Sequence, residues 1–427
     1  MQLRAFLRQV VGVGAASIAE RMAALLLGIL LARWLGVEDY GVYAFVMASV
    51  SLLLIGVKLG LPELIMRDIA ASRANGGDVS AHSVSLNTAR SLIFPASLAI
   101  SAIVALIVYF TITDQRLVHA FWVGLLLLPL LSLLDLHAYA LRGLGKAVLA
   151  QYAAILLPSI LVLLLIALLF FWSEADPALA LGSRIIAVFI TLAVTVRLLG
   201  GKVSDRTRTR VASPTKARAL LLQSLPFLLI GGVGVIMTRS DVIMLGILLD
   251  PQEVGIYNAA AQAAMLVGLV RDISNTIAAP EFSRLYAGGD KAALEKFAVS
   301  TARFVLIVAV PLVIILVLFA GRMLGALFGA DFAEGGPVLT ILALGIGLSL
   351  FWGEPGFLLN MSGNERVVFR LYAIMAIMNI VLNFALIPLM GAPGAALATV
   401  TVINVQRVLG WWLTKKIVGV STNVLCL

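Results

Sequence analysis

Charged residues are scarce in this chain: Asp, Glu, Lys and Arg make up 12% of its 427 residues. A typical water-soluble domain carries about 25%. Hydrophobic residues make up 61% of the chain, and its mean hydropathy is +1.07. This composition excludes a water-soluble globule and indicates a protein that lies mostly within a lipid bilayer.

Residues that carry chemistry are also scarce. The one cysteine, Cys426, excludes a disulfide framework and a cysteine-ligated metal site. The three histidines lie in different segments, without the spacing of metal ligands. The segment RGLGKA at 142–147 lacks the first Gly and the Ser or Thr of a phosphate-binding loop, which argues against an ATPase. We therefore expect a protein that is not an enzyme and that holds no resident metal or cofactor.

Long apolar runs are what the sequence does contain. A helix needs about 20 apolar residues to cross the core of a bilayer. Twelve runs of that length lie between charged or Gly/Pro-marked breaks, and they predict an all-α membrane protein with twelve transmembrane helices. The predicted spans are roughly 11–33, 40–65, 86–110, 118–141, 148–172, 178–200, 219–249, 254–280, 298–320, 336–361, 367–390 and 394–414.

Basic residues are distributed unevenly among the connections. Lys and Arg are retained on the cytoplasmic side of short loops. With the N-terminus inside, the even-numbered connections are basic, as in GKVSDRTRTRVASPTKAR at 201–218, and the first loop is acidic, with Glu38 and Asp39. The net charge of +9 is therefore a topology signal, and nucleic acid is not an expected partner. We expect a multi-pass protein of the cell membrane with both termini cytoplasmic.

The chain also repeats itself. Gly41 and Tyr43 align with Gly255 and Tyr257 at an offset of 214 residues, about half the chain length. Further matches follow in the same order: NTARSLIFP at 87–95 with STARFVLIV at 300–308, and Gly145 with Gly363. We infer that the chain is two copies of one six-helix unit.

An even number of helices in each copy relates the two by an axis along the membrane normal, which is a parallel repeat. We predict an N-terminal six-helix bundle at 1–200, a cytoplasmic basic linker at 201–218 and a C-terminal six-helix bundle at 219–427. The binding site is expected between the two bundles.

Several charged residues fall within the apolar runs: Glu20 and Arg21, Lys58, Arg239 and Asp241, Arg271 and Asp272. Each basic group at the centre of a span costs about 2.5–3.5 kcal/mol if it faces lipid, so four cost on the order of 10–14 kcal/mol. We expect them to face protein or a wet cavity. The alternatives are ion pairs, such as Arg239 with Asp241, and snorkelling, for which Lys58 near a span end is the first candidate.

Small residues share a helix face with two of these arginines. Ser17, Ala24 and Gly28 lie on the face of Arg21, and Ala261, Ala264, Gly268 and Asn275 on that of Arg271. Small side chains leave room around an arginine, which favours a cavity. The glycines of GGVGVI at 231–236 are instead expected to permit close contact between helices.

Two stretches resemble a known family. ARWLGVEDYGVYAFVMA at 32–48, DVIMLGILLDPQEVGIYNAAAQ at 241–262 and the twelve-span layout resemble polysaccharide-export transporters of the O-antigen flippase type. These share a superfamily with lipid II flippases and with multidrug and toxin extrusion (MATE) proteins. Lipid II flippases usually have two further helices, which are not among the predicted spans.

The resemblance implies a MATE-like fold and an activity. The substrate would be an oligosaccharide linked to undecaprenyl pyrophosphate, such as the O-antigen unit of lipopolysaccharide, moved from the cytoplasmic to the outer leaflet of the inner membrane by alternating access. Expected partners are this substrate, membrane lipid and other polysaccharide-assembly membrane proteins. Because no nucleotide-binding loop is present, energy is expected from an H+ or Na+ gradient or from the membrane potential.

The resemblance also assigns roles to the charged and polar residues of the spans. The basic residues would bind the pyrophosphate, since guanidinium donates a bidentate fork and Lys supplies a point charge. They are Arg21, Lys58, Arg239 and Arg271. Amides would meet the glycan hydroxyls: Asn258, Gln262 and Asn275. Three carboxylates are candidates for ion coupling: Glu20, Asp241 and Asp272.

Two other function classes stay open. An ion-coupled MATE-type exporter of small, often cationic compounds needs uncompensated carboxylates with aromatics, whereas each central acid here has a basic neighbour. A non-transporting scaffold for membrane glycosyltransferases has no positive feature in the sequence.

Overall fold

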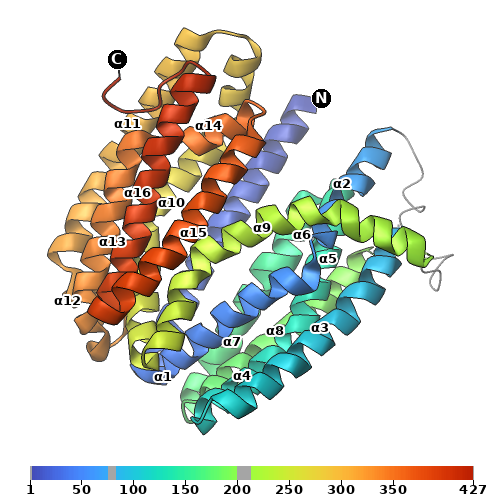
Figure 1. Cartoon of the computed structure of the whole chain (residues 1–427), viewed down its shortest axis with the longest axis vertical. Helices are drawn as coiled ribbons and strands as arrows, with labels where there is room; N and C mark the ends of the chain where they lie inside the picture. The colour runs from blue at the N-terminus through green and yellow to red at the C-terminus, as the bar shows by residue number, and fades with distance from the viewer. Residues whose placement is uncertain (1, 76–82, 200–212, 427) are drawn as a thin grey trace. The chain divides into compact units, whose positions relative to one another are not determined.

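The computed structural model describes residues 2–75, 83–199 and 213–426, and these residues contain helices and no strand (Figure 1). They form two compact units: the first comprises 1–35 and 42–235, and the second comprises 36–41 and 236–427. Ten helices of the described ranges are long and apolar enough to cross a membrane. The prediction of an all-α membrane protein is therefore confirmed.

The first unit contains the helices from α1 to α8 and the first part of α9. Their bounds are α1 (Gln2–Lys58), α2 (Leu61–Ala74), α3 (Ser83–Thr111), α4 (Gln115–Leu125), α5 (Leu127–Gly143), α6 (Ala147–Gln151), the π-turn η2 (Tyr152–Leu156), α7 (Leu157–Trp172), α8 (Pro177–Leu199) and α9 (Pro214–Leu248). Most of the largest fully buried side chains of this unit come from α2, α3 and α5, among them Ile65, Ile93 and Leu128. The core of this unit therefore lies where α2 and α3 pack on α5.

The second unit contains the rest of α9 and the helices that follow it. These are α10 (Pro251–Ala287), α11 (Lys291–Leu318), α12 (Ala320–Phe328), the 3-10 turn η3 (Ala330–Gly335), α13 (Gly336–Ser349), the 3-10 turn η4 (Leu350–Trp352), α14 (Pro355–Met361), α15 (Glu365–Met390) and α16 (Ala392–Ile417). Helix α16 packs between α13 and α15 (Figure 1). Glu253 in the first turn of α10 accepts a hydrogen bond from the backbone N–H of Ala392 at 2.8 Å, which places the starts of α10 and α16 together.

The predicted spans fall on helices apart from short breaks such as 59–60 and 353–354, and residue 200 lies outside the described residues. Two differences in detail remain. The first two run together as one apolar helix, Ala19–Lys58, because the acidic stretch expected to be a loop is helical apart from Gly36 (φ 77, ψ 178). Helix α16 is 26 residues long, but polar residues in its middle, Asn404, Gln406 and Arg407, lower its hydropathy, and it is not among the ten. The first connection is thus a kink at a glycine instead of a loop.

Helix α9 runs through the boundary between the two units at 235/236. Residues 201–212 of the predicted linker lie outside the described residues, and 214–218 are the first turns of this helix. A Cβ on Gly232 would lie 3.3 Å from the side chain of Ile55 on α1, whereas a Cβ on Gly231 or Gly234 would meet nothing within 4 Å. The predicted close helix contact is therefore confirmed for Gly232 and not for the other two glycines. Unpacked glycines cost about 1 kcal/mol each relative to Ala in a helix, and they make α9 easier to bend here.

The duplication is visible in how equivalent helices end. Gly145 and Gly363 both have positive φ, 72° and 77°. In the first case the N–H of Lys146 donates to the carbonyl of Leu141 at 3.1 Å, and in the second the N–H of Asn364 donates to Leu359 at 3.0 Å. Both are the six-residue bridge of a Schellman cap, in which glycine adopts the left-handed conformation at no steric cost. The aligned glycines therefore do the same work in both copies.

Gly41 and Gly255 form a reciprocal contact within the second unit. A Cβ on Gly41 would overlap the carbonyl oxygen of Pro251, and a Cβ on Gly255 would overlap the carbonyl oxygen of Val37. Pro251 follows Val37 by 214 residues (251 − 37), as Gly255 follows Gly41 (255 − 41). One contact is therefore made twice with the partners exchanged, as a local two-fold relation requires. The repeated stretch has glycine here because two backbones cross without room for a side chain.

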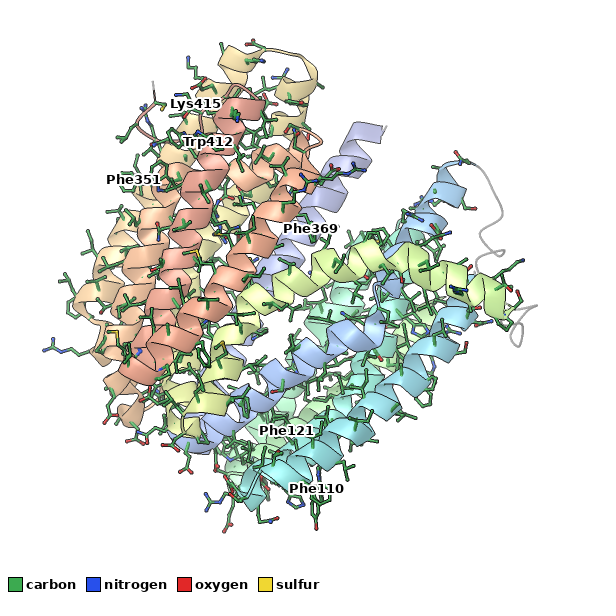
Figure 2. The ribbon with its side chains drawn as sticks, in the orientation of Figure 1. Phe110, Phe121, Phe351, Phe369, Trp412 and Lys415 are labelled. Atoms are coloured by element: carbon green, nitrogen blue, oxygen red, sulfur yellow. The ribbon has the colours of Figure 1, made fainter. Side chains whose placement is uncertain are left out.

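Apolar side chains cover the outside of the helices, as a lipid-facing surface requires. Phe110, at the end of α3, is 75% exposed and points away from the ribbon (Figure 2). Trp412 and Lys415 lie near the C-terminal end of α16 in the same view, and the Lys416 ammonium stands 4.9 Å from the centre of the Trp412 ring. Tryptophan with lysine at a helix end is typical of the membrane–water interface.

Candidate functional site

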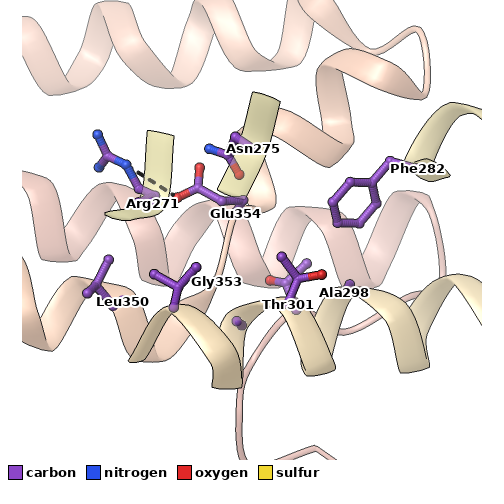
Figure 3. A pocket seen from close by; sticks show the side chains of 11 residues that line it. Arg271, Asn275, Phe282, Ala298, Thr301, Leu350, Gly353 and Glu354 are labelled. Atoms are coloured by element: carbon purple, nitrogen blue, oxygen red, sulfur yellow. Dashed lines mark ion pairs between the residues drawn. The ribbon is translucent and has the colours of Figure 1, made fainter. Parts of the chain in front are cut away.

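A network of charged side chains joins three elements of the second unit. Glu354, directly before α14, forms an ion pair with Arg407 of α16 (Oε2 to Nη1, 2.9 Å). Its other oxygen, Oε1, lies 3.7 Å from Nε of Arg271 on α10 (Figure 3). The same Nε donates to Oδ1 of Asp272 at 3.1 Å. Two basic and two acidic groups are thus held together inside a membrane-spanning unit.

The chain turns sharply to bring Glu354 into this network. Gly353 has φ 63° and ψ −142°, and a Cβ there would overlap the carbonyl oxygen of Thr422. Its own carbonyl accepts a hydrogen bond from Nη1 of Arg407 at 3.0 Å. The side chains of Arg407 and Glu354 are 15% and 19% exposed, against 27% for Arg271. Arg271 is therefore the more accessible of the two arginines.

A small cavity lies beside the network. Its polar lining comes from Arg271, Asn275, Thr301, Glu354 and Thr422, and Phe282 is among its apolar walls (Figure 3). The space open to a water-sized molecule is about 20 Å³, enough for about one water. In this conformation the cavity is too small to admit a sugar or a phosphate.

Asp241 is the buried acid of a second cluster, formed with neutral side chains. Its carboxylate accepts hydrogen bonds from the Tyr257 hydroxyl (2.7 Å), the Thr399 hydroxyl (2.5 Å) and the Asn383 amide (2.7 Å). The same amide donates to Oδ1 of Asn379 at 3.1 Å. Asp241 is buried, whereas Arg239, two residues before it, is exposed, and residues two apart do not face each other on a helix.

Asn258 and Gln262 hold the repeated stretch in place. Both donate to the hydroxyl of Tyr40, Asn258 at 2.9 Å and Gln262 through a shorter hydrogen bond. Tyr40 is 1% exposed and stacks edge-on against Phe332. The amide donors expected to meet glycan hydroxyls are thus engaged with a buried tyrosine.

In the first unit, Lys58 ends α1 and forms an ion pair with Asp135 of α5 at 2.7 Å. Lys58 is thus paired, with its side chain 22% exposed, and does not extend alone toward a membrane surface. On α1, Glu20 is half-buried and Arg21 is exposed. Of the predicted residues, the structure therefore brings together Arg271, Asp272 and Asn275, and it places Asp241 in a cluster of its own.

The two copies keep equivalent pairs with altered chemistry. Lys58 with Asp135 corresponds to Arg271 with Glu354, at offsets of 213 (271 − 58) and 219 (354 − 135). Tyr43 accepts a hydrogen bond from Arg184 at 3.2 Å in the first unit, whereas its counterpart Tyr257 donates to Asp241 and contacts Thr399 in the second. Among the residues that the structure describes, the tyrosine of the second copy thus binds a buried acid and that of the first copy binds an arginine.

Several side chains that contact the predicted site residues were not themselves predicted from the sequence. The missed residues are Asp135, Glu354, Asn383, Thr399 and Arg407, all within predicted spans. A complete census of charged residues within the spans would have found Asp135, Glu354 and Arg407. Nothing in the local sequence marks Asn383 or Thr399, because polar uncharged residues are frequent in apolar helices.

This fold is that of known transporters. It matches a solved structure of a multidrug resistance MATE family transporter in its inward-facing conformation, with a TM-score of 0.75 and 17% identity over 94% of each chain. It also matches the lipid II flippase MurJ in an inward closed conformation, with a TM-score of 0.76 and 14% identity over 94% of this chain and 87% of the other. The prediction of a MATE-like fold is confirmed.

Residues 6–286 match the family described as "Polysaccharide biosynthesis protein", and the chain belongs to this family. Two similar proteins are the capsular polysaccharide biosynthesis protein CapF of Staphylococcus aureus, 22% identical over 47% of this chain and 50% of that protein, and the "Probable low-salt glycan biosynthesis flippase Agl15" of Haloferax volcanii, 25% identical over 40% and 36%. An uncharacterized membrane protein of Methanocaldococcus jannaschii is 29% identical over 32% of this chain and 27% of its own length. The chain thus spans half or less of the curated relatives it matches.

Proposed function

We propose that this protein is a flippase that moves a lipid-linked oligosaccharide from the cytoplasmic to the outer leaflet of the cell membrane, and that it is not an enzyme. Membership of the polysaccharide biosynthesis family and the name of the Haloferax relative support this function. The observation that carries it is the accessible Arg271, held at the edge of a charged network inside a membrane-spanning unit. An undecaprenyl pyrophosphate carrier with an O-antigen or other surface polysaccharide unit fits such a cation, and its diphosphate would be bound by the guanidinium.

The experiment that tests this function compares export of surface polysaccharide by variants at matched membrane levels. Arg271→Ala and Arg21→Ala are expected to lose most of the export, since each charge-assisted contact is worth about 1.5–3 kcal/mol, roughly ten- to a hundredfold in affinity. Arg271→Lys keeps the charge and should retain part of it. Arg284→Ala is the matched control, because Arg284 lies on the same helix and pairs with Glu281 at the exposed surface. If the two site variants export as well as the control, these arginines do not bind substrate.

We further propose that transport is coupled to a cation at Asp241. The cluster offers the Asp241 carboxylate, the hydroxyls of Tyr257 and Thr399 and the side-chain oxygens of Asn379 and Asn383. Oδ1 of Asn383 is buried and has no hydrogen-bond partner among the described residues. An orphaned oxygen beside a carboxylate fits a hard cation such as Na+, because such ions take oxygen ligands.

The coupling test uses purified protein in vesicles with a labelled lipid-linked sugar. An inward Na+ gradient is expected to accelerate flipping by the parent and not by Asp241→Asn. If only a proton gradient accelerates flipping, the coupling ion is H+ and not Na+. Undiminished transport with every gradient collapsed would refute coupling and leave a facilitated flippase. A cationic dye run in parallel tests the second candidate function, an ion-coupled exporter, which the buried acid of this cluster favours.

A further inference from the structure

Arg271 uses only part of its guanidinium in its ion pairs. In the described part of the chain, its contacts with both Asp272 and Glu354 are made through Nε. The terminal nitrogens, directed away from Phe282 in Figure 3, are the ones that form the flat edge for a bidentate anion. Two carboxylates stand within 4 Å of this cation: Asp272 already bonds Nε at 3.1 Å, whereas Glu354 stands at 3.7 Å and would neutralise the cation further by closing on it.

Arg407 holds one of these carboxylates back. It pairs with Oε2 of Glu354 at 2.9 Å and donates to the adjacent Gly353 carbonyl at 3.0 Å. Two contacts to neighbouring residues fix where the carboxylate stands. Oε1 then remains 3.7 Å from Nε of Arg271, longer than a charge-assisted hydrogen bond.

The first unit shows what the pair does without such an arginine. Lys58 and Asp135, the counterparts of Arg271 and Glu354, are in direct contact at 2.7 Å. Residues 188–193, which precede Arg407 by 219 to 214 residues, read VFITLA and include no basic residue that could share the acid. The acid closes on its cation in the copy that lacks the second base.

We propose that Arg407 is a positioning residue: by binding Glu354, it keeps the terminal nitrogens of Arg271 available to an anionic phosphate group of the substrate. This role rests on the proposed function, since it deepens how Arg271 binds its anion. Loss of Arg407 frees Glu354 to pair fully with Arg271, so binding is lost through self-neutralisation of the site. Removing the charge of Glu354 as well should therefore restore binding.

The test measures binding of inorganic pyrophosphate to the purified full-length chain in detergent by titration calorimetry. Arg407→Gln is expected to weaken binding about ten- to a hundredfold, as does Arg271→Ala. The double variant Arg407→Gln/Glu354→Gln should recover most of the lost affinity for pyrophosphate. The affinity of Arg407→Lys should lie between those of Arg407→Gln and the parent. Lys416→Gln, which removes the same charge from the exposed end of α16, should bind as the parent does.

Four results would overturn the proposal. The first is that Arg407→Gln binds pyrophosphate as tightly as the parent, and the second is that its loss of binding persists in the double variant; either would mean that Arg407 only supports the backbone at Gly353. The third is that Arg271→Ala binds as the parent does, and the fourth is that the parent does not bind pyrophosphate. Misfolding is separated from loss of binding by the double variant and by melting temperatures recorded for every sample. If the parent and variants bind pyrophosphate as expected but the parent exports no polysaccharide, the proposed flippase function is refuted while the positioning role of Arg407 is supported.

Discussion

The reciprocal crossing at Gly41 and Gly255 makes a quantitative prediction. Gly41→Ala places a Cβ on the carbonyl of Pro251, and Gly255→Ala places one on the carbonyl of Val37. Neither obstacle is a flexible side chain, so the two backbones must separate. Overpacking of this kind costs about 1–3 kcal/mol, which at about 2–4 °C per kcal/mol lowers the melting temperature by about 2–12 °C.

The double variant is the sharper test. The contacts at Gly41 and Gly255 belong to the same crossing of two helix backbones. When the backbones separate to admit the first Cβ, they also make room for the second. The double variant should cost less than the sum of the singles, by about 0.5 kcal/mol or more. Gly182→Ala is the control, because a Cβ there meets nothing within 4 Å; it should raise stability by up to about 1 kcal/mol.

Thermal unfolding of the purified variants in one detergent, followed by tryptophan fluorescence, gives these differences. Melting of Gly41→Ala at or above the parent's temperature would refute the crossing. So would a double variant whose loss equals the sum of the two single losses, since independent sites add.

Three further predictions concern single contacts. The exchange Lys58→Asp/Asp135→Lys should melt closer to the parent than either single change, each of which costs about 1 kcal/mol for this partly exposed pair; equal melting of all four proteins would contradict the pairing. Tyr257→Phe removes a donor to the buried Asp241 and should cost about 1–3 kcal/mol in thermal unfolding, whereas an unchanged melting temperature would show that this hydrogen bond contributes nothing. Cys426 should react with an impermeant thiol reagent only after cell lysis, because the C-terminus is predicted to be cytoplasmic; labelling of intact cells would reverse the topology.

The glycines show which backbone features could be predicted from local sequence and which could not. The repeat alignment singled out Gly41 with Gly255 and Gly145 with Gly363, and in both pairs the structure gives the two glycines the same task. The glycines at 231 and 234 had no such counterpart, and the expectation of close packing failed there. A repeated glycine reports a shared backbone requirement, whereas a lone glycine run does not say whether a neighbour is close.

The hydropathy of the sequence determined the all-α membrane class and the positions of the spans, and the 214-residue offset determined the duplication. Both can be counted along the chain without any knowledge of three-dimensional contacts. Only the tertiary structure decided which charges meet. Glu354 lies between Arg271 and Arg407, and Asp241 accepts hydrogen bonds from Asn383 and Thr399. The physical reason is that Glu354, Arg407, Asn383 and Thr399 belong to other segments than the charges they contact, and the packing of those segments depends on every side chain between them.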